Sequence, residues 1–404
     1  MSATALAPPA AIAPATSGAT AVERLRARIG WTALNWIAPA LNTTGYGDEA
    51  RTFLRALDGA GLEPRLVHIG PSGFEPTLPT GRLLRRCLAR HWPAAGSLAV
   101  YHSTVLPVQP GEGGAVPISR TMFETDSVPA SWLPWLRAMR RIWVPSEFHV
   151  ETFARGGVDP DRLRTLPAGL DFQLYRPAGP ALDLRGGRGF AFLSAFDFSD
   201  RKGWQVLLDA YVREFAGDDD VTLVLKVATH RMDEPEIARR IERHVATTGV
   251  AAGRRPAIVL HGTRLSEADM PALYRGADAY VSPTRGEGWG RPLMEALACG
   301  VPVIASRWSG QMAFLDDANA WLVDGRLVRV PPDVDLAEPE QYVGHRWFDP
   351  DEDALRGAMR AVRDEPASAR RRIAGAPAAL AERFGDAAIA ERVAELALEA
   401  LDGA

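Results

Sequence analysis

Cysteines, long apolar runs and export signals are scarce in this sequence of 404 residues. The two cysteines, Cys87 and Cys299, lie far apart, so neither a disulfide framework nor a cysteine zinc site is indicated. No apolar run approaches the ~18 residues of a membrane span. Residues 1–20 are rich in Ala, Pro and Thr and lack a basic segment before an apolar core, unlike a signal peptide. We therefore expect a cytoplasmic protein with a disordered tail over residues 1–27.

A strong excess of charge of either sign is also missing. The net charge is −4: residues 1–179 carry 18 arginines and 14 acidic residues, for +4, and the remainder carries −8. Neither half has the basic field of a nucleic-acid binder, so no nucleic-acid partner is expected. Residues 81–92 and 131–143 group arginines with tryptophans, a composition that can also dock on anionic membranes. Such runs are usually solvated faces, and we expect at most a peripheral membrane contact.

What the sequence does contain is a regular alternation of two kinds of segment. From residue 28 onward, strand-like apolar runs alternate with helix-like segments, which is typical of parallel sheets covered by helices. A Gly- and Pro-rich stretch without periodicity, residues 166–189, interrupts the alternation, which then restarts. The pattern predicts two α/β domains with a cleft between them, and ligands at the carboxyl ends of the strands.

These features set the predicted domain boundaries. Residues 28–178 form the first domain and residues 179–385 the second. Residues 386–404 include a strongly amphipathic helix that could pack back on the first domain as a brace.

Residues 284–306, TRGEGWGRPLMEALACGVPVIAS, read as a glycine turn, a short helix and a buried strand. Pro292 suits the first helical turn, so the three glycines of the turn lie at a helix N-terminus, where free amides favour an anion. Glu287 and Glu295 stand eight residues apart in this segment. An anion site beside two carboxylates suits a nucleotide sugar, which offers a diphosphate to the amides and hydroxyls to the glutamates. The glycines are Gly286, Gly288 and Gly290.

A pair of cations is predicted on the same rim of the second domain. Arg201 and Lys202 follow the strand-like residues 189–196 and precede a helix. That order places both at the carboxyl edge of the sheet, as for the turn at Glu287. Two fixed cations together with helix amides can stabilise a departing diphosphate without a metal ion.

Aspartate patterns typical of metal-dependent sugar transferases occur elsewhere. Asp218, Asp219 and Asp220 match such a pattern, but they precede a strand and so lie on the rim opposite the cleft. We interpret them as a solvated turn, and the pairs Asp333 with Asp335 and Asp349 with Asp351 likewise. No metal site and no cofactor are therefore expected.

The first domain offers polar residues at its own carboxyl edge. Gly45 and Gly47 make a turn before a helix, but they do not form a dinucleotide-binding fingerprint, and we assign them to the donor side of the cleft. His102 ends a strand and is predicted to point into the cleft. Glu124 and Asp126 follow the next strand and could bind acceptor hydroxyls.

Taken together, these segments resemble glycosyltransferase family four, the retaining nucleotide-sugar enzymes of the GT-B fold with two Rossmann-like domains. The stretch GEGWGRPLMEALACGVPVIAS looks like the family's E-x7-E signature. GYGDEARTFLRAL is similar to its N-terminal glycine loop, and FDFSDRKGWQVLLDAY resembles its phosphate loop. VPSEFHVETFARGGVDPDRLRTLPAGLDFQLYRP and VLHGTRLSEADMPALYRGADAYVSPT resemble its end-of-first-domain and nucleotide-base passages. The resemblance runs from about Gly30 to the C-terminus.

The resemblance implies a role for each matching residue. Arg201 and Lys202 would bind the diphosphate, Glu295 the ribose and Glu287 the donor sugar, with His102 near the anomeric carbon. Backbone amides of the turn and the following helix would hold the phosphate. The residues that would supply these amides are Gly288, Trp289, Gly290, Arg291 and Leu293.

One departure from the family pattern concerns the first strand of the second domain. The family often has Gly-Arg at the end of that strand, where this chain has Ser194 and Ala195. Arg201 could replace the missing cation.

The implied function is retaining transfer of a hexosyl unit from a nucleoside-diphosphate sugar to a hydroxyl acceptor. Two alternatives keep the same fold: a nucleotide-sugar epimerase, and a catalytically altered relative that only binds sugar. The glutamate pair together with the Arg-Lys pair favours the transferase. The base, the sugar and the acceptor stay open.

Overall fold

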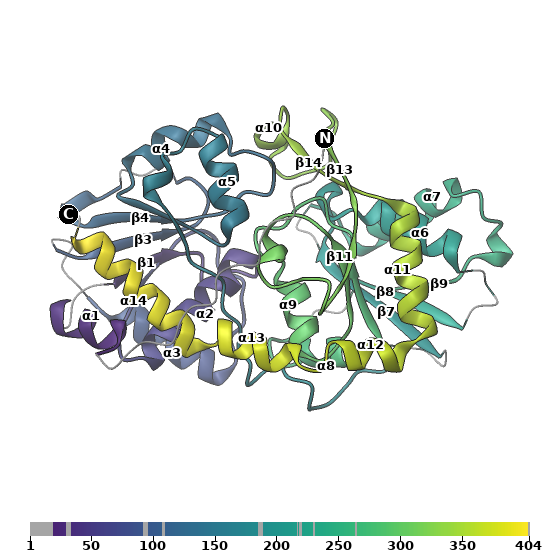
Figure 1. Cartoon of the computed structure of the whole chain (residues 1–404), viewed down its shortest axis with the longest axis horizontal. Coiled ribbons are helices and arrows are strands. Elements are labelled where there is room, and N and C mark those ends of the chain that lie inside the picture. The colour runs from purple at the N-terminus through teal and green to yellow at the C-terminus, as the bar shows by residue number, and fades with distance from the viewer. Residues whose placement is uncertain are drawn as a thin grey trace.

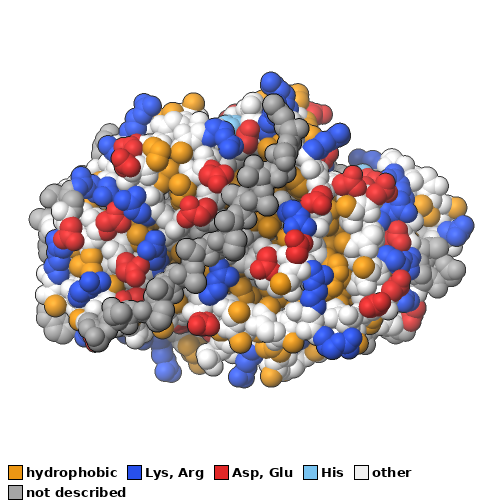
Figure 2. Space-filling view, in the orientation of Figure 1, with side chains coloured by type: hydrophobic (Ala, Val, Ile, Leu, Met, Phe, Trp, Pro, Cys, Tyr) orange, Lys and Arg blue, Asp and Glu red, His pale blue; other side chains and the backbone are white. Residues whose placement is uncertain are grey.

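A computed structural model of the chain describes residues 19–29, 34–91, 96–106, 110–184, 189–215, 217, 220–228, 231–262 and 265–402. It has two lobes, each built on a six-stranded sheet flanked by helices (Figure 1). Figure 2 shows acidic and basic side chains interspersed over one face of the molecule, in keeping with the small net charge.

The first lobe holds a parallel sheet in the order β2-β1-β3-β4-β5-β6. Its central strand β3 is apolar and buried on both faces because helices cover both: Val100 is fully buried on one face, and Ala99 and Tyr101 are buried on the other. The strands are β1 (Leu34–Ala38), β2 (Arg65–His68), β3 (Leu98–His102), β4 (Val116–Arg120), β5 (Arg141–Val144) and β6 (Leu163–Thr165). The helices are α1 (Ala21–Ile29), α2 (Gly45–Gly59), α3 (Leu78–Ala89), α4 (Leu133–Ala138) and α5 (Glu147–Arg155).

The second lobe holds a parallel sheet in the order β12-β11-β10-β7-β8-β9. This is the doubly wound order of a Rossmann domain. Its strands are β7 (Phe190–Asp197), β8 (Val221–Ala228), β9 (Ala257–Leu260), β10 (Ala279–Ser282), β11 (Val303–Ser306) and β12 (Trp321–Val323). Its helices include α6 (Trp204–Glu214), α7 (Glu234–Thr247), α8 (Met270–Arg275), α9 (Arg291–Ala298) and α11 (Glu352–Asp364).

An antiparallel hairpin, β13 (Gly325–Arg329) and β14 (Arg346–Pro350), lies between β12 and α11 in the chain. With the short α10 (Pro339–Tyr342) it sits at the top of the molecule, between the lobes (Figure 1). This hairpin was not predicted from the sequence.

The last helices lead from the second lobe back to the first. In Figure 1, α12 (Pro366–Arg372) and α13 (Ala376–Phe384) run along the base of the molecule, and α14 (Asp386–Asp402) crosses the first lobe. Ile389, Val393 and Ala397 of α14 are buried in one cluster with Leu25 of α1 and Phe53 of α2. The chain therefore passes twice between the lobes.

The disordered tail predicted for residues 1–27 includes residues that the structure shows as a helix. Residues 1–18 lie outside the described part of the chain, but residues 21–27 belong to helix α1. Ala21 and Leu25 are buried against α14, and the Glu391 side chain accepts hydrogen bonds from the Ala21 and Val22 amides. The prediction of a tail up to residue 27 is therefore wrong for these residues, because the apolar partner of α1 lies some 370 positions further along the chain.

The strand order determines where a crevice for a ligand can open in each sheet. In the second sheet the strand order reverses between β7 and β10, and in the first between β1 and β3. Loops that leave such neighbouring strands diverge and open a crevice at the carboxyl edge. The predicted fold class is confirmed: two doubly wound parallel sheets with flanking helices. Among the helices of the described residues, none has the length and apolarity needed to cross a bilayer.

Candidate active site at the lobe interface

Arg201 and Lys202 lie at the switch point of the second sheet. They form a short 3-10 turn, Asp200–Lys202, directly after β7, and Glu287 lies on the loop after the neighbouring strand β10. The Lys202 ammonium donates to Glu287 Oε1 at 2.6 Å, and Arg201 Nη1 lies 3.6 Å from Glu287 Oε2. The two loops that the sequence placed on one rim are thus in direct contact.

Burial and charge act against each other in this group. Burial alone would raise the pKa of Glu287, but Lys202 and Arg201 outweigh it, so the pKa lies below its ordinary value. Burial lowers the pKa of Lys202, and the attraction of Glu287 offsets this only in part. Burial also opposes the charge of Arg201, yet Glu124, Tyr342 and Glu287 raise its pKa. The site therefore holds fixed charges of both signs.

The glycine turn brings the backbone of the two lobes close together. A Cβ at Gly286 would lie 2.3 Å from the Glu124 carbonyl oxygen, and one at Gly288 would lie 2.1 Å from Met122 Sδ. Both partners belong to the loop after β4. A side chain at Gly286 would meet backbone and force the lobes apart, whereas one at Gly288 would require the Met122 side chain to move.

Gly290 caps helix α9 with φ +85°, a conformation that favours glycine. The Leu293 amide donates to the Gly290 carbonyl at 3.0 Å, so it is not free for an anion as the sequence analysis expected. The Trp289 side chain is buried between Phe314 and Phe384, and it serves the core. Only the backbone of Trp289 can serve a ligand, and the roles of the Gly288, Gly290 and Arg291 amides stay predictions.

Glu295 lies one helical turn beyond the start of α9 and is buried. Its Oε2 accepts from the Tyr274 hydroxyl at 2.7 Å, and Arg291 Nη2 lies 3.6 Å from Oε1. Burial and the nearby Glu295 carboxylate raise the pKa of Tyr274 well above its ordinary value, so the hydroxyl keeps its proton and donates it. The carboxylate is held in one place by two neighbours, as a ribose ligand would need.

His102 ends β3 at the switch point of the first sheet, but its side chain is fully buried. Trp36 Nε1 lies 3.1 Å from its Nδ1, and Glu49 Oε2 lies 2.8 Å from its Nε2. Because an indole N–H can only donate, Nδ1 accepts and Nε2 carries the proton toward Glu49. Both ring nitrogens are thus used within the lobe, and the expected exposure of this side chain in the cleft is absent in this structure.

Glu49 joins His102 to a buried arginine. Its other oxygen accepts from Arg120 Nη2, and Arg120 is fully buried at the end of β4. Burial alone would raise the pKa of Glu49, but Arg120 and His102 lower it to about 2. Burial lowers the pKa of His102, which therefore stays neutral near pH 7. The three side chains form a compact charged network under the candidate site.

The glycine loop of the first lobe is the start of helix α2. Gly45 opens the helix, and the Thr44 side chain caps it by accepting from the Gly47 amide at 3.3 Å. A Cβ at Gly47 would lie 2.5 Å from Asn42 Oδ1. These contacts explain, by packing within the lobe, why a glycine is needed at position 47. Donor binding by Gly45 and Gly47 stays a prediction.

Glu124 and Asp126 face the second lobe. Glu124 accepts from the Tyr342 hydroxyl at 2.9 Å and lies 3.5 Å from Arg201 Nη2. Asp126 Oδ1 accepts from the Arg346 amide, and the Asp126 amide donates to the Arg346 carbonyl. Both side chains therefore lie at the lobe interface, at the edge of the candidate site.

Potential metal ligands are dispersed. Asp218 and Asp219 lie outside the described residues. Asp335 is paired with Arg231 and Arg240, and Asp349 lies 3.3 Å from Arg285. In the part of the chain that is described, no three His, Cys, Asp or Glu side chains are grouped so as to hold a metal ion.

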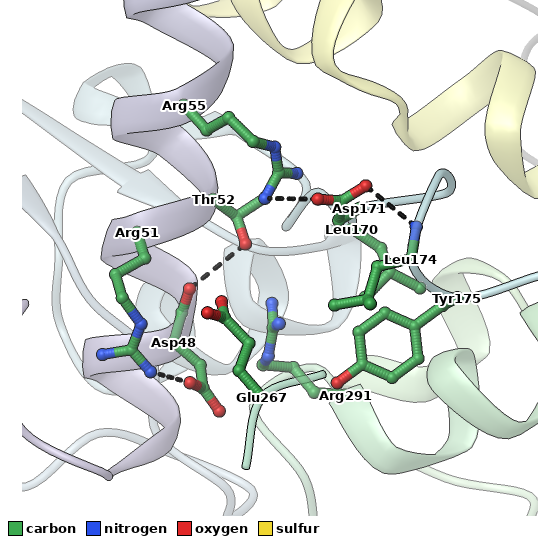
Figure 3. Close-up of a pocket in the computed structure, with 10 residues that line it drawn as sticks. All are labelled: Asp48, Arg51, Thr52, Arg55, Leu170, Asp171, Leu174, Tyr175, Glu267 and Arg291. Carbon is green, nitrogen blue, oxygen red and sulfur yellow. Dashed lines mark hydrogen bonds and ion pairs between the residues drawn. The ribbon is translucent and has the colours of Figure 1, made fainter. Parts of the chain in front are cut away.

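A pocket opens beside Arg291, between α2, the connection after β6 and the start of α9 (Figure 3). Figure 3 shows Glu267 and Arg291 pointing into it from the second lobe, opposite the side chains of α2. Its volume of about 30 Å³ suits water and is too small for a nucleotide. The lining residues are Asp48, Arg51, Thr52, Arg55, Leu170, Asp171, Leu174, Tyr175, Glu267 and Arg291.

Four residues of the site were missed by the sequence reasoning: Glu49, Arg120, Tyr274 and Tyr342. Glu49 could have been found, because it shares the buried face of α2 with Phe53 and Ala56, and an acid on an apolar stripe is unusual. Arg120 ends a buried strand, which is a similar signal. No local pattern marks Tyr342, whose partner belongs to the other lobe.

The match to a known protein family falls mainly on the second lobe. The sequence model of the family described as Glycosyl transferases group 1 matches residues 187–337. A D-inositol 3-phosphate glycosyltransferase of Geodermatophilus obscurus is 32% identical over 181 residues, 42% of this chain and 38% of the relative. One from Acidothermus cellulolyticus is 26% identical over 258 residues, 60% of this chain and 52% of the relative. The chain thus spans about half or less of the length of these curated relatives.

Solved structures extend the likeness to both lobes. Anabaena HepE, crystallised with UDP-glucose, superposes with a TM-score of 0.65 at 14% identity, covering 91% of this chain and 99% of HepE. Sucrose-phosphate synthase from Thermosynechococcus elongatus gives a TM-score of 0.63 at 18% identity, covering 92% and 99%. At these identities the likeness shows the fold. The likeness across both lobes is to the two-domain GT-B fold of these structures, and the match to the Glycosyl transferases group 1 family covers residues 187–337.

Proposed function

We propose that this protein transfers a hexosyl unit from a nucleoside-diphosphate sugar to a hydroxyl acceptor, with retention of configuration. The observation that carries the proposal is the direct contact of Arg201 and Lys202 with Glu287 at the switch point of the second sheet. Cations, a glycine turn and a carboxylate meet there, as a ligand with both a diphosphate and sugar hydroxyls requires.

The relatives support the class of both substrates. HepE was crystallised with UDP-glucose, which makes a nucleotide sugar the donor to expect. The curated relatives are named for inositol phosphate, a hydroxylated acceptor. For this chain we propose a nucleoside-diphosphate sugar as donor and a sugar or other hydroxylated compound as acceptor.

The proposed chemistry follows from the placement of charge. The bond between the anomeric carbon and the diphosphate oxygen breaks, and negative charge develops on that oxygen. Lys202 and Arg201 stabilise this charge because they are fixed in place before the reaction. The acceptor oxygen attacks the anomeric carbon from the face that the diphosphate leaves, and its proton passes to the departing phosphate. Glu287 orients the sugar and does not act as the base.

A donor panel tests the proposal. The protein is incubated with nucleoside-diphosphate sugars of several bases and a set of hydroxylated acceptors, and release of the nucleoside diphosphate is followed. We expect release from at least one donor, with the anomeric configuration of the product retained in its proton NMR spectrum. Conversion of the donor into an isomeric sugar nucleotide would instead indicate an epimerase, and binding without turnover a sugar-binding relative.

Activity should not depend on a divalent metal ion. Arg201 and Lys202 supply the positive charge that a metal ion would supply in a metal-dependent transferase. The transfer rate should therefore stay within about twofold in excess EDTA. A loss of activity that added magnesium restores would contradict the prediction.

Replacing Glu287 by Gln and replacing Glu295 by Gln should impair different properties of the protein. Losing a hydrogen bond to a charged group costs about 1.5–3 kcal/mol, or roughly 10- to 150-fold. Glu295→Gln should lose this in the affinity for the nucleoside diphosphate, whereas Glu287→Gln should lose it in turnover without a loss of affinity for the nucleoside diphosphate. Calorimetry and initial rates on both variants give the answer. Equal losses of nucleoside-diphosphate affinity would refute the division of roles.

A further inference from the structure

The segment of residues 325–350, here called the bridging segment, joins the loops on both sides of the candidate site. On the side of the second lobe, the Asp335 amide donates to Asp200 Oδ2 at 2.9 Å, next to Arg201, and the Phe348 amide donates to the Arg285 carbonyl at 3.0 Å. On the side of the first lobe it contacts the loop after β4, where Arg346 and Asp126 exchange two hydrogen bonds. The bridging segment thus follows the strands of the second lobe in the chain, and its hydrogen bonds to Asp126 also attach it to the first lobe.

Glu124 is the point at which this segment meets the catalytic cations. One carboxylate oxygen accepts from the Tyr342 hydroxyl at 2.9 Å, and the other lies 3.5 Å from Arg201 Nη2. The Tyr342 ring packs on Phe123 with centroids 4.7 Å apart, which holds the hydroxyl beside Glu124. Glu124 and Arg201 each retain only 16% side-chain exposure, so water screens their attraction weakly.

The carboxylates around the two cations leave little net positive charge to attract a diphosphate. Lys202 is bonded to Glu287, and Arg201 lies between Glu287 and Glu124, so two positive charges face two negative ones. A diphosphate that enters this group adds negative charge next to both carboxylates. Glu287 comes from the same lobe as the cations, whereas Glu124 comes from the other lobe and can move away with it.

We propose that Glu124 is a competing counter-ion of Arg201, which the diphosphate of the donor displaces and which expels the nucleoside diphosphate after transfer. The inference rests on the proposed function and adds a residue for the product-release step. When the sugar has left, the Glu124 carboxylate returns to Arg201 and weakens the hold on the leaving nucleotide. Tyr342 is a positioning residue, because it keeps Glu124 within reach of Arg201.

Affinity for the nucleoside diphosphate tests the proposal, with UDP, GDP, ADP and inorganic pyrophosphate as the probes in calorimetry. Glu124→Gln removes the charge and keeps an oxygen that can accept from Tyr342. We expect this variant to bind the preferred probe about three- to tenfold more tightly than wild type, since a partly buried competing ion pair is lost. Glu151→Gln is the matched control, because Glu151 is an exposed acid on α5 of the same lobe, outside the candidate site, and this variant should bind the probe like wild type.

A second pair of variants shows whether the effect passes through Arg201. In an Arg201→Ala background, adding Glu124→Gln should change affinity by less than about twofold, since the cation they share is gone. An unchanged or lower affinity of Glu124→Gln, with Lys202→Ala losing binding, would overturn the inference and leave the proposed function intact. A gain that persists without Arg201 would overturn it too. No binding of any probe to any folded variant would overturn both.

Discussion

Replacing Lys202 by Ala is expected to lower turnover by about 10²- to 10³-fold, because removing one preorganised donor to a developing oxyanion costs about that much. Lys202 is buried, and its ammonium is fixed 2.6 Å from Glu287, so no other cation can take its position without rearrangement. Affinity for the nucleoside diphosphate should fall as well, since the charge of the diphosphate exists in the ground state. Initial rates and calorimetry on the same preparation measure both effects.

Two further variants make this result specific. Lys226 lies on the neighbouring strand β8, and Lys226→Ala should retain most of the turnover if position and not lysine content matters. Lys202→Arg keeps the positive charge and should be faster than Lys202→Ala. It should stay slower than wild type, because a planar guanidinium differs in shape from an ammonium group. Turnover of Lys202→Ala within threefold of wild type would remove this residue from the mechanism.

The largest effect on stability is expected for Glu49→Gln. Arg120 and His102 are fully buried, and Glu49 is the carboxylate that faces both. Loss of its charge leaves the Arg120 guanidinium uncompensated in the lobe interior, which costs about 3–5 kcal/mol. Urea unfolding followed by tryptophan fluorescence should show the loss, because Trp36 contacts His102 in the same network.

The same carboxylate should make stability depend on pH. Its folded-state pKa of about 2 lies below the ordinary value of 4.5, so its contribution is present above pH 4.5 and is lost as the pH falls toward 2. The difference corresponds to roughly 3 kcal/mol. Wild type should therefore lose more unfolding free energy than Glu49→Gln over this interval. Glu151→Gln, an exposed acid on α5, serves as the control and should follow wild type. Parallel losses in wild type and Glu49→Gln would contradict the assignment.

Much of the fold was accessible from the sequence because the signal is local. The alternation of apolar runs and amphipathic segments predicted the strands and helices that carry the site, and Gly290 and Pro292 marked the start of α9. The order of strand, loop and helix was enough to place Arg201, Lys202 and Glu287 on one rim. The structure adds that these side chains bond to one another.

Other features depend on contacts between distant segments, which a single sequence does not show. His102 was expected to face the cleft because it ends a strand, but Trp36 and Glu49 draw both of its ring nitrogens into the lobe. Glu124 was expected to reach the rim of the cleft because it follows β4, and it does so, but its partners Arg201 and Tyr342 come from the other lobe and could not be predicted; its binding of acceptor hydroxyls stays a prediction. In both cases the strand end was predicted correctly, and the partners of the side chain were decided by tertiary packing.

The return of α14 to the first lobe has a consequence for how the chain is made. Leu25, Phe53 and Trp36 emerge early during synthesis, but the helix that covers them carries Ile389, Val393 and Ala397. Domains ordinarily fold in order as they leave the ribosome. Here the first lobe keeps an apolar face uncovered until the second lobe has been synthesised, so its folding can finish only after α14 has left the ribosome. A nascent chain stalled before residue 386 should therefore present this face to chaperones, although all six strands of its first sheet have already been made.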